Sequence, residues 1–321
     1  MQETRRRVLD ALADGPVTGP ELAERLDVSR AAVWKHVEAL REAGFEVEGT
    51  DDGYVLRSVP EYGGPAIEYG LEAEFDVEFH DALGSTNARA RELAAEGHDD
   101  TVVVAAEQTG GRGRLDREWA SPRGGVWLSI VCRPAVPPAQ VPIYTLAAAV
   151  AVTRAAREAG VPAEIKWPND VLVRVGDGER KLCGILTEME GEADRVSWVV
   201  VGIGVNLNVD ESDLPAAANA TSLRAYREHA GHEGDTDVPR RLFVQRVLEE
   251  FDDLRADPES VLPAWREYAS TLGRRVRVGT PGGEVVGEAV DVAFPGTLVV
   301  ETDEGTRRVT AGDCEHLRPV E

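Results

Sequence analysis

Lysine is nearly absent from this chain. It occurs at Lys35, Lys166 and Lys181 alone, so 32 of the 35 basic residues are arginine. Acidic residues are in excess, and the formal net charge is −23. This balance argues against a protein that coats nucleic acid without sequence preference. Acidic excess with so little lysine indicates adaptation to a salt-rich cytoplasm, although an acidic protein from an ordinary cytoplasm would have the same composition.

Cysteine and long apolar runs are also scarce. Cys132, Cys183 and Cys314 form no Cys-x-x-Cys pair, which argues against a disulfide framework and a structural zinc site. The apolar runs are short and interrupted, so we expect no membrane span. No long apolar region follows the arginine-rich N-terminus, so we expect no signal peptide. The 321 residues, 42% of them hydrophobic, predict a cytoplasmic protein of two or three domains.

Residues 1–60 are predicted to form a winged helix-turn-helix domain. Thr18-Gly19-Pro20-Glu21 is a capping-box pattern that starts one helix. Ser29 can cap the next helix, whose apolar residues recur on a single face. Asp51-Asp52-Gly53 lies between two alternating runs, which indicates a hairpin. Two helices joined by a tight turn and followed by a hairpin are typical of DNA-binding domains.

The candidate DNA contacts of this domain lie on its third helix: Ser29, Arg30, Lys35 and His36, with Arg41 on the same face. Residues 1–57 hold 8 basic residues against 12 acidic ones, a local net charge of −4. This acidic balance keeps open a second interpretation, in which the helical domain contacts a protein. We favour DNA binding because helix, turn and wing occur in the expected order.

Residues 61–270 are predicted to form a central mixed-sheet α+β domain after a linker at residues 58–70. We expect helices at 86–96, 141–158, 239–256 and 258–269, and strands near 77–80, 102–106, 125–133, 181–186 and 198–206. A further strand over 164–173 is expected to break at Pro168. Turns are expected at 176–178 and 191–194, and a polar loop with one short helix at 210–237. Short β runs over 271–321 predict a small SH3-like barrel.

The most informative stretch of the central domain is Gln108-Thr109-Gly110-Gly111-Arg112-Gly113-Arg114, followed by Trp119. Glycine lets the backbone approach a ligand closely, and the forked arginine cation suits carboxylate and phosphate. A carboxylate that attacks a triphosphate must first overcome charge repulsion. Two arginines on a glycine-rich loop, with Lys166 and Lys181 as further cations, suit such an activation. No catalytic Ser-His-Asp or Cys-His set is apparent, and this reaction needs none.

Other polar residues of this domain have both a functional and a structural interpretation. Ser85-Thr86-Asn87 precedes a helix, and capping accounts for only one of the three. Trp119 could simply be a core residue, and Lys166 could simply pair with a carboxylate such as Glu188. Cys183 is better explained as an apolar filler than as a nucleophile, because it lies within a strand.

A series of motifs makes the sequence resemble the bifunctional biotin–protein ligases that also act as biotin-operon repressors. The resemblance covers nearly the whole chain, from the winged helix to the small C-terminal domain. In chain order its motifs are residues 28–36, Ser85-Thr86-Asn87, Gln108 to Arg114 with Trp119, Lys166-Trp167-Pro168-Asn169-Asp170, Lys181-Leu182-Cys183-Gly184-Ile185-Leu186, Gly202-Ile203-Gly204-Val205-Asn206 and Ala220-Thr221-Ser222-Leu223.

The resemblance implies a reaction in two steps. Biotin and MgATP would give biotinyl-5′-AMP and pyrophosphate, and the biotinyl group would pass to a lysine of a biotin carboxyl carrier domain. It also implies operator DNA as a partner, biotinyl-5′-AMP as corepressor and a homodimer. Asp170 would accept a proton from the incoming amine. The implied catalytic residues are Arg114, Lys181 and Asp170; the implied biotin-binding residues are Ser85, Thr86, Asn87, Gln108, Arg112, Gly113, Arg114, Trp119, Lys181 and Gly184; the implied nucleotide-binding residues are Arg112, Lys166, Asn169 and Asn206.

One departure from the family pattern concerns the glycine–arginine loop. Many relatives have Arg-Gly where this chain has Leu115-Asp116, which leaves the flexibility of the loop and its link to dimerisation open. Three alternatives are kept: a ligase whose N-terminal domain does not repress, a lipoyl or octanoyl ligase, and a transcription factor that only senses a small molecule. Lipoyl and octanoyl ligases carry an Arg-Arg-x-Ser-Gly-Gly-Gly loop, which this chain lacks.

Overall fold

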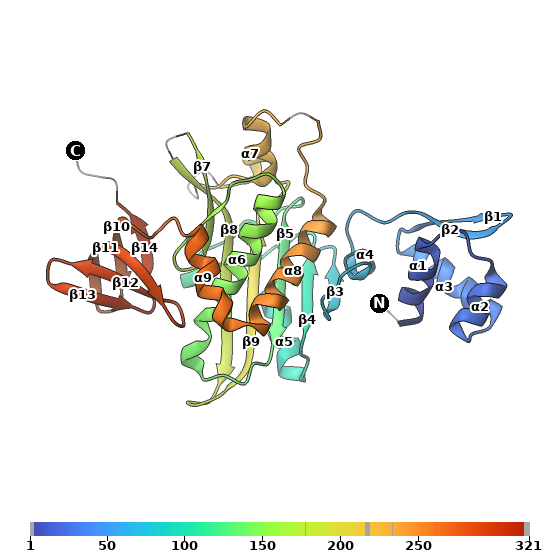
Figure 1. The fold of residues 1–321 in the computed structure, drawn as a ribbon, viewed down its shortest axis with the longest axis horizontal. Helices are drawn as coiled ribbons and strands as arrows, with labels where there is room; N and C mark the ends of the chain where they lie inside the picture. Colours follow the sequence, from blue (N-terminus) through green and yellow to red (C-terminus); the bar gives the residue numbers. More distant parts are fainter. Residues whose placement is uncertain (1–2, 177, 216–218, 233, 318–321) are drawn as a thin grey trace. The chain divides into compact units, whose positions relative to one another are not determined.

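The computed structural model describes residues 3–176, 178–215, 219–232 and 234–317 (Figure 1). The chain divides into two compact units, Met1–Phe79 and His80–Glu321. The domain boundaries expected after residues 60 and 270 stay predictions. Among the described residues, none of the helices combines the length and the apolar character that crossing a membrane requires.

The smaller unit has the helices and the hairpin that the sequence predicts. Its elements are α1 (Glu3–Ala13), α2 (Gly19–Leu26), α3 (Arg30–Glu42), β1 (Glu46–Thr50), β2 (Gly53–Ser58), α4 (Gly64–Glu68) and β3 (Asp76–His80). The backbone N–H of Thr18 donates to the Glu21 carboxylate at 2.9 Å, and Glu21 N–H donates to Thr18 Oγ1 at 3.3 Å. The capping box therefore starts α2 as predicted. The stretch expected to be a plain linker contains α4, a short helix with Pro65 in its first turn.

The larger unit carries the central α+β domain. Its helices are α5 (Thr86–Glu96), α6 (Pro142–Glu158), α7 (Leu223–His229), α8 (Arg240–Ala256) and α9 (Pro258–Tyr268). Its first six strands are β4 (Thr101–Ala105), β5 (Val126–Cys132), β6 (Glu164–Lys166), β7 (Asp170–Val175), β8 (Gly178–Gly191) and β9 (Val196–Val205). The expected turn at 176–178 includes residue 177, and the loop at 210–237 includes residues 216–218 and 233; these lie outside the described residues.

The strands of the larger unit follow the order β4-β5-β9-β8-β7-β6 in the main sheet. Each of these neighbouring pairs is antiparallel. Outside these pairs, short parallel bridges join Leu83 with Gln108 and Lys181 of β8 with Ala220.

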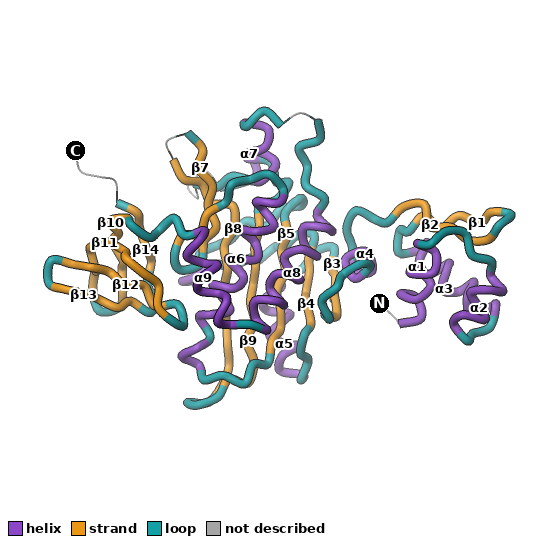
Figure 2. The backbone as a smooth tube through the Cα atoms, viewed as in Figure 1, coloured by secondary structure: helices purple, strands orange, loops and turns teal. Residues whose placement is uncertain are grey.

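The two faces of the main sheet have different neighbours. Successive residues of a strand point to opposite faces. Thr187 of β8 bonds with Thr145 of α6 at 2.7 Å, so α6 covers the face to which Thr187 points. Figure 2 shows α6, α8 and α9 layered over the strands. Ser129 of β5 contacts residues at the start of α5, so α5 lies on the other face. That second face carries the candidate site.

Residues 164–175 form a tight hairpin where we expected one broken strand. β6 and β7 pair antiparallel, with Lys166 opposite Asp170. The chain reverses at Trp167-Pro168-Asn169, and the Trp167–Pro168 peptide bond is cis. Proline cannot donate to a strand ladder, so the ladder ends on one side of it and resumes on the other. The reversal presents Asn169 and Asp170 at one end of the hairpin.

The C-terminal strands form an antiparallel sheet in the order β13-β12-β11-β10-β14. They are β10 (Arg274–Thr280), β11 (Gly283–Ala293), β12 (Thr297–Thr302), β13 (Gly305–Val309) and β14 (Asp313–His316). Within the described part of the chain, β13 and β14 stand at opposite ends of this order and do not pair. The predicted closed SH3-like barrel is therefore not confirmed, and the described strands make an open sheet.

Candidate active site

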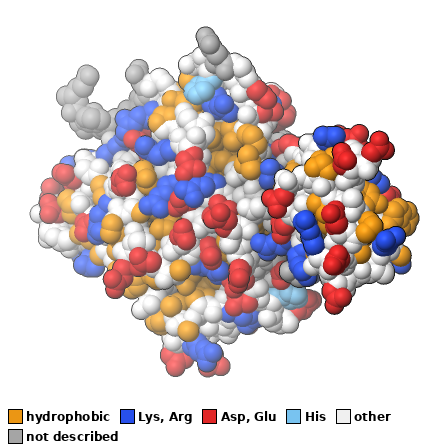
Figure 3. Space-filling view, turned by 45° about the vertical axis from the view of Figure 1, so that its right-hand side comes forward, with side chains coloured by type: hydrophobic (Ala, Val, Ile, Leu, Met, Phe, Trp, Pro, Cys, Tyr) orange, Lys and Arg blue, Asp and Glu red, His pale blue; other side chains and the backbone are white. Residues whose placement is uncertain are grey.

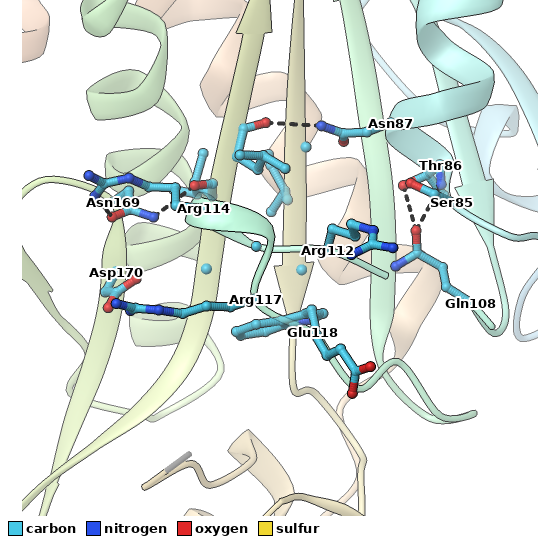
Figure 4. Close-up of a pocket in the computed structure, with 18 of the residues that line it drawn as sticks. Ser85, Thr86, Asn87, Gln108, Arg112, Arg114, Arg117, Glu118, Asn169 and Asp170 are labelled. Atoms are coloured by element: carbon cyan, nitrogen blue, oxygen red, sulfur yellow. Dashed lines mark hydrogen bonds between the residues drawn. The ribbon is translucent and has the colours of Figure 1, made fainter. Parts of the chain in front are cut away.

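A cavity of about 380 Å³ brings together most of the residues that the sequence singles out. It lies between the start of α5, the glycine–arginine loop, the β6–β7 hairpin and the middle of β8 and β9. Figure 4 shows Ser85, Thr86 and Gln108 at one end, and Asn169 and Asp170 at the other. The predicted residues that line it are Ser85, Thr86, Asn87, Gln108, Arg112, Gly113, Arg114, Trp119, Asn169, Asp170, Lys181 and Gly184.

At one end of the cavity is a hydrogen-bonded group that we call the polar wall: Thr86, Asn87 and Gln108, which line the cavity, and Ser129, which is buried against Thr86 and Asn87 and does not line it. Gln108 Oε1 accepts from the Thr86 backbone N–H at 2.8 Å and lies 3.0 Å from Thr86 Oγ1, which also donates to it. Gln108 Nε2 donates to Ser121 Oγ at 2.9 Å. The amide of Gln108 is thus oriented by both of its ends. Ser85 caps α5 by accepting from Ala88 N–H at 3.4 Å, so capping accounts for Ser85 alone.

Ser129 is the member of the polar wall that the sequence reasoning missed. Its hydroxyl is fully buried and lies 2.8 Å from Thr86 Oγ1 and 2.6 Å from Asn87 Oδ1. Asn87 Nδ2 in turn donates to the Glu188 carboxylate at 2.8 Å and to Leu186 O at 3.2 Å. A serine in a run of buried apolar strand residues was the available signal, because buried hydroxyls need partners.

Glycines on the main sheet make room for the cavity. Gly202 of β9 stands opposite Ser129 of β5 in the strand register. A Cβ on Gly202 would lie 2.0 Å from Asn87 Oδ1, and one on Gly204 would lie 2.7 Å from Trp119 Nε1. No side chain fits there without displacing the wall or the tryptophan. The Gly-Ile-Gly motif therefore forms a floor on which Asn87 and Trp119 rest.

Trp119 and Lys181 occupy the middle of the cavity. The ammonium of Lys181 lies 5.0 Å from the centroid of the Trp119 ring, within cation–π range. The same ammonium lies 2.6 Å from Asp170 Oδ1. The buried indole N–H of Trp119 has no hydrogen-bond partner among the residues that the structure describes. A buried donor beside a cavity is a group that a ligand could satisfy.

Arg114 reaches across to the β6–β7 hairpin. It donates to Asn169 Oδ1 and to the backbone oxygen of Gly312, both at 2.8 Å. Asn169 donates its own Nδ2 to Ile185 O at 2.9 Å, which turns its oxygen toward Arg114. Arg114 has five guanidinium donors, so these two bonds leave others available to an anion.

The rest of the glycine–arginine loop is more exposed. We use "the arginine loop" for residues 111–118. Leu115 and Asp116 have φ values of 57° and 55°, in the left-handed region that glycine adopts at lower cost. Leu115 is 75% exposed. Arg112 makes one long contact, 3.5 Å to Asp116 O. Arg117, which the sequence reasoning missed, forms an ion pair with Asp313 of β14.

Two predicted site residues lie outside this cavity. Lys166 borders a neighbouring cavity of about 290 Å³ beside the C-terminal sheet. Its suggested partner Glu188 instead contacts Asn87 and Arg91, the latter at 2.8 Å. Asn206 is buried and donates to Thr221 O at 3.2 Å. Its side-chain oxygen has no partner within the described part of the chain.

Cys183 lies beneath the cavity in β8 and is fully buried. Burial raises the pKa of its thiol far above the ordinary value. A thiol that stays protonated is a poor nucleophile, so the interpretation of Cys183 as an apolar filler fits its surroundings.

The predicted DNA contacts on α3 are not equivalent. Ser29 caps the helix by accepting from Ala32 N–H at 3.1 Å. Arg30 and Lys35 are exposed, whereas His36 is only partly exposed. Burial, and then the charge of Arg5, lower the pKa of His36, which weakens it as a cation for phosphate.

Two further residues of α3 bear on this surface. Arg41 donates to Val47 O at 2.8 Å and to Glu38 at 2.6 Å, so it is held within the domain. Trp34, which is not among the predicted DNA contacts, is 56% exposed and precedes Lys35. Acidic and basic side chains are interspersed over the face drawn in Figure 3.

The geometry of the cavity suits a long ligand with a neutral polar head and an anionic tail. The polar wall offers both donors and acceptors. Trp119 offers an apolar surface. Lys181 in the middle and Arg114 at the far end supply cations. Such an order matches a ligand whose carboxylate is brought to a phosphate between two cations.

Comparison with known proteins agrees with this geometry. Residues 82–206 match the biotin/lipoate A/B protein ligase family, residues 4–55 match a helix-turn-helix domain, and residues 271–317 match the biotin protein ligase C-terminal domain. The chain is 39% identical over 316 residues to the bifunctional ligase/repressor BirA of Bacillus subtilis, covering 93% of each chain.

Two further similar proteins are named as biotin ligases. The biotin–[acetyl-CoA-carboxylase] ligase of Mycobacterium tuberculosis is 39% identical over 249 residues, which cover 73% of this chain and 86% of the relative. The structure of the Aquifex aeolicus biotin protein ligase in complex with biotin and ATP superposes with a TM-score of 0.60. The two chains are 26% identical, and the match covers 76% of this chain and 99% of the other.

Proposed function

The chain belongs to the family of bifunctional ligase/repressor proteins, and from that premise we propose that the cavity of about 380 Å³ is where its ligase chemistry occurs. The protein is an ATP-dependent biotin protein ligase with an N-terminal helix-turn-helix domain. One observation carries the assignment of the site: a hydrogen-bonding wall, an apolar ring and two cations follow one another along a single cavity.

The polar wall receives the ureido ring of biotin in this proposal. A urea has two N–H donors and one acceptor. Gln108 and Thr86 of the wall, with Ser85 beside it, supply both kinds of partner. Trp119 packs against the apolar part of the ligand. The carboxylate then points toward Arg114 and Lys181, away from the wall.

Adenylation follows from this placement. A biotin carboxylate oxygen attacks the α-phosphorus of ATP, an O–P bond forms, and the bond to the β-phosphate oxygen breaks to release pyrophosphate. Arg114 and Lys181 offset the repulsion between the two anions. Mg²⁺ enters as part of the substrate MgATP. Arg112, Asn169, Lys166 and Asn206 are proposed nucleotide contacts, of which Lys166 and Asn206 lie outside the cavity.

Transfer uses the same end of the cavity. The lysine amine of a carboxyl carrier domain attacks the acyl carbon, a C–N bond forms, and the C–O bond to AMP breaks. Asp170 holds Lys181 at 2.6 Å in the structure. When Lys181 turns to the phosphate, Asp170 is left to accept the proton that the amine loses.

Incubation with labelled biotin, MgATP and a carrier domain tests the ligase proposal. We expect label in the carrier only when both biotin and MgATP are present, with pyrophosphate released in the first step. Release of pyrophosphate with lipoate or octanoate but not with biotin would overturn it. A chain that binds biotin without releasing pyrophosphate would point to a sensor.

The repressor role is proposed to depend on a biotinyl-5′-AMP-bound homodimer that binds operator DNA through α3. Arg30 and Lys35 are its exposed cations, while Ser29 sets the start of the helix. Selection of DNA sites by the adenylate-bound chain, followed by a gel shift, would test this. R30A/K35A should lose the shift and keep ligase activity. If the wild-type chain selects no site at any salt concentration, it is a ligase that does not repress.

A further inference from the structure

A partly buried charged cluster lies outside the cavity, where β8 meets the C-terminal sheet. Glu179 of β8 lies 2.6 Å from Arg274 Nη1 and 3.0 Å from His316 Nδ1. His316 has a side chain only 7% exposed. Its other nitrogen, Nε2, lies 3.0 Å from the hydroxyl of Thr271, which is fully buried. The hydrogen bond from His316, opposed by burial, lowers the pKa of Glu179 to about 2, so this carboxylate stays charged.

The cluster is connected to the active-site hairpin. The backbone N–H of Trp167 donates to Thr271 Oγ1 at 2.9 Å. Trp167 begins the reversal that presents Asn169 and Asp170 to the cavity. The indole N–H of Trp167 donates at 2.9 Å to the backbone oxygen of Gly296, in the turn between β11 and β12. Both N–H groups of Trp167 therefore donate to residues of the C-terminal region.

His316 is also the last residue of β14, and the first residue of that strand holds the arginine loop. Asp313 forms an ion pair with Arg117, and the preceding Gly312 accepts from Arg114 at 2.8 Å. Within the described residues, β14 pairs with β10 alone. An edge strand of four residues has few ladder bonds to fix it. Besides that pairing, the buried Cys314 and the bond from Leu317 N–H to Arg275 O, the contacts of its two end residues contribute to its position.

We propose that His316 is a positioning residue that, by fastening β14 to Glu179 and Thr271, sets the place at which Asp313 and Gly312 hold the arginine loop over the site. The inference rests on the proposed function of the cavity. Loosening His316 lets β14 shift, so Arg117 loses Asp313 and Arg114 keeps Asn169 but loses Gly312. The loop then opens more often. The residues of the polar wall are unaffected, because none of them contacts β14.

The same strand supplies a matched control. Glu315 lies between the two ends of β14 and pairs with Arg277 at 3.2 Å, with both side chains exposed. It shares the outward face with Asp313, two residues earlier, but contacts neither the loop nor the cluster through that pair. E315Q therefore removes a charge from β14 and leaves both fastenings in place.

The test is the lifetime of preformed biotinyl-5′-AMP on the full-length chain, chased with unlabelled ligand. We expect D313N and H316L each to shorten the adenylate lifetime by roughly 5-fold. The double variant D313N/H316L should shorten that lifetime no further than the larger single change, because the effects of coupled sites are not additive. H316Q should restore part of the lifetime. E315Q should stay within about 2-fold, and biotin affinity should be unchanged in all variants. E179Q, which keeps the shape of the cluster, serves if H316L does not fold.

Two results would overturn the inference: a lifetime for H316L and E179Q equal to that of E315Q, or a double variant whose effect is the product of the single ones. Failure of the proposed function gives a different signal, since the wild-type chain would then form no adenylate to chase.

Discussion

The polar wall and the arginine loop face each other across one cavity, yet their side chains are held in different ways. Thr86, Gln108 and Asn87 are bonded to one another or to Ser129, and Ser129 is fully buried. The loop has an exposed Leu115 and two non-glycine residues in the left-handed region. Its arginines reach partners in distant parts of the chain, such as Gly312 and Asp313.

This difference suggests a division of labour. A pre-bonded wall loses little conformational entropy when it receives a neutral ring, so it suits recognition. A loop held by a few long-range contacts can open to admit ligands and close over an intermediate, so it suits retention and charge stabilisation. Changes in the wall should therefore affect biotin affinity, and changes in the loop should affect the adenylate.

The largest effect is expected from R114A. Loss of one pre-organised donor at a developing charge lowers rates by about 10²–10³-fold. We expect that loss in adenylate formation, measured as pyrophosphate release, with biotin affinity changed far less. R123A is the matched control, because Arg123 pairs with Glu107 on the surface at 3.4 Å and does not line the cavity. Equal rates of adenylate formation in R114A and R123A would contradict the role given to the arginine loop in charge stabilisation.

G202A should be next in size. Its Cβ would lie 2.0 Å from Asn87 Oδ1, so the polar wall must move or the strand must shift. Overpacking of this kind costs about 1–3 kcal/mol. Biotin titration and thermal unfolding should both show the loss. G49A gives the control, since a Cβ there meets no atom within 4 Å. Unaltered biotin affinity in G202A would mean that the wall is not pre-organised by this floor.

S129A should weaken biotin binding by roughly 10-fold, because it leaves the buried Asn87 oxygen without its 2.6 Å partner. The rate of adenylate formation at saturating biotin should change little. Isothermal titration and single-turnover rates separate the two. S197A is a control on an exposed position of β9. If S129A lowered the rate of adenylate formation without lowering biotin affinity, Ser129 would support the chemical step and not biotin recognition.

The smallest expected effect concerns the ion pair between Glu179 and His316, and it depends on pH. The pKa of Glu179 falls from an ordinary 4.5 to about 2 in the folded chain, chiefly through the hydrogen bond from His316. A carboxyl group whose pKa is lowered on folding stabilises the folded chain above pH 4.5, and this stabilisation is lost as the pH falls toward 2. Allowing for solvent screening, that stability is on the order of 1 kcal/mol.

E179Q should remove this contribution. Urea unfolding between pH 6 and pH 2.5 should give a flatter stability profile for E179Q than for the wild-type chain. E315Q, on an exposed pair, should follow the wild type. Identical slopes for E179Q and the wild type would show that the cluster does not titrate in this window.

Much of the fold could be predicted from local patterns. The capping box at Thr18, the N-cap at Ser85 and the glycine that ends α5 mark element boundaries through bonds between close neighbours in sequence. Patterns failed where distant residues decide the outcome. The β6–β7 hairpin depends on the reversal at Pro168 and on pairing with β8, and the open C-terminal sheet depends on which edges meet.

The candidate site divides in the same way. Residue type predicted Arg114 and Lys181, because cations on or near a glycine-rich loop suit an anionic ligand. The family resemblance alone predicted Gln108. Ser129 and Arg117 were missed, because neither belongs to a motif. Ser129 matters through Thr86, more than forty residues away in sequence, and Arg117 matters through Asp313, nearly two hundred residues away. Lys166 and Asn206 were assigned from motifs, and they lie outside the cavity.

The sequence alone determined the chemistry that this protein has available: arginines on a glycine loop, two lysines of only three in the chain, and a helix-turn-helix with an acidic balance. Adaptation of this acidic chain to a salt-rich cytoplasm stays a prediction. Only the tertiary structure decided how those groups are held. Antiparallel pairing of β5, β8 and β9 places Ser129 opposite Gly202 and Gly184 opposite Gly204, so one end of the cavity is built on the sheet. The other end takes its fixed points from β14, which no local pattern could place, because its contacts span the length of the unit.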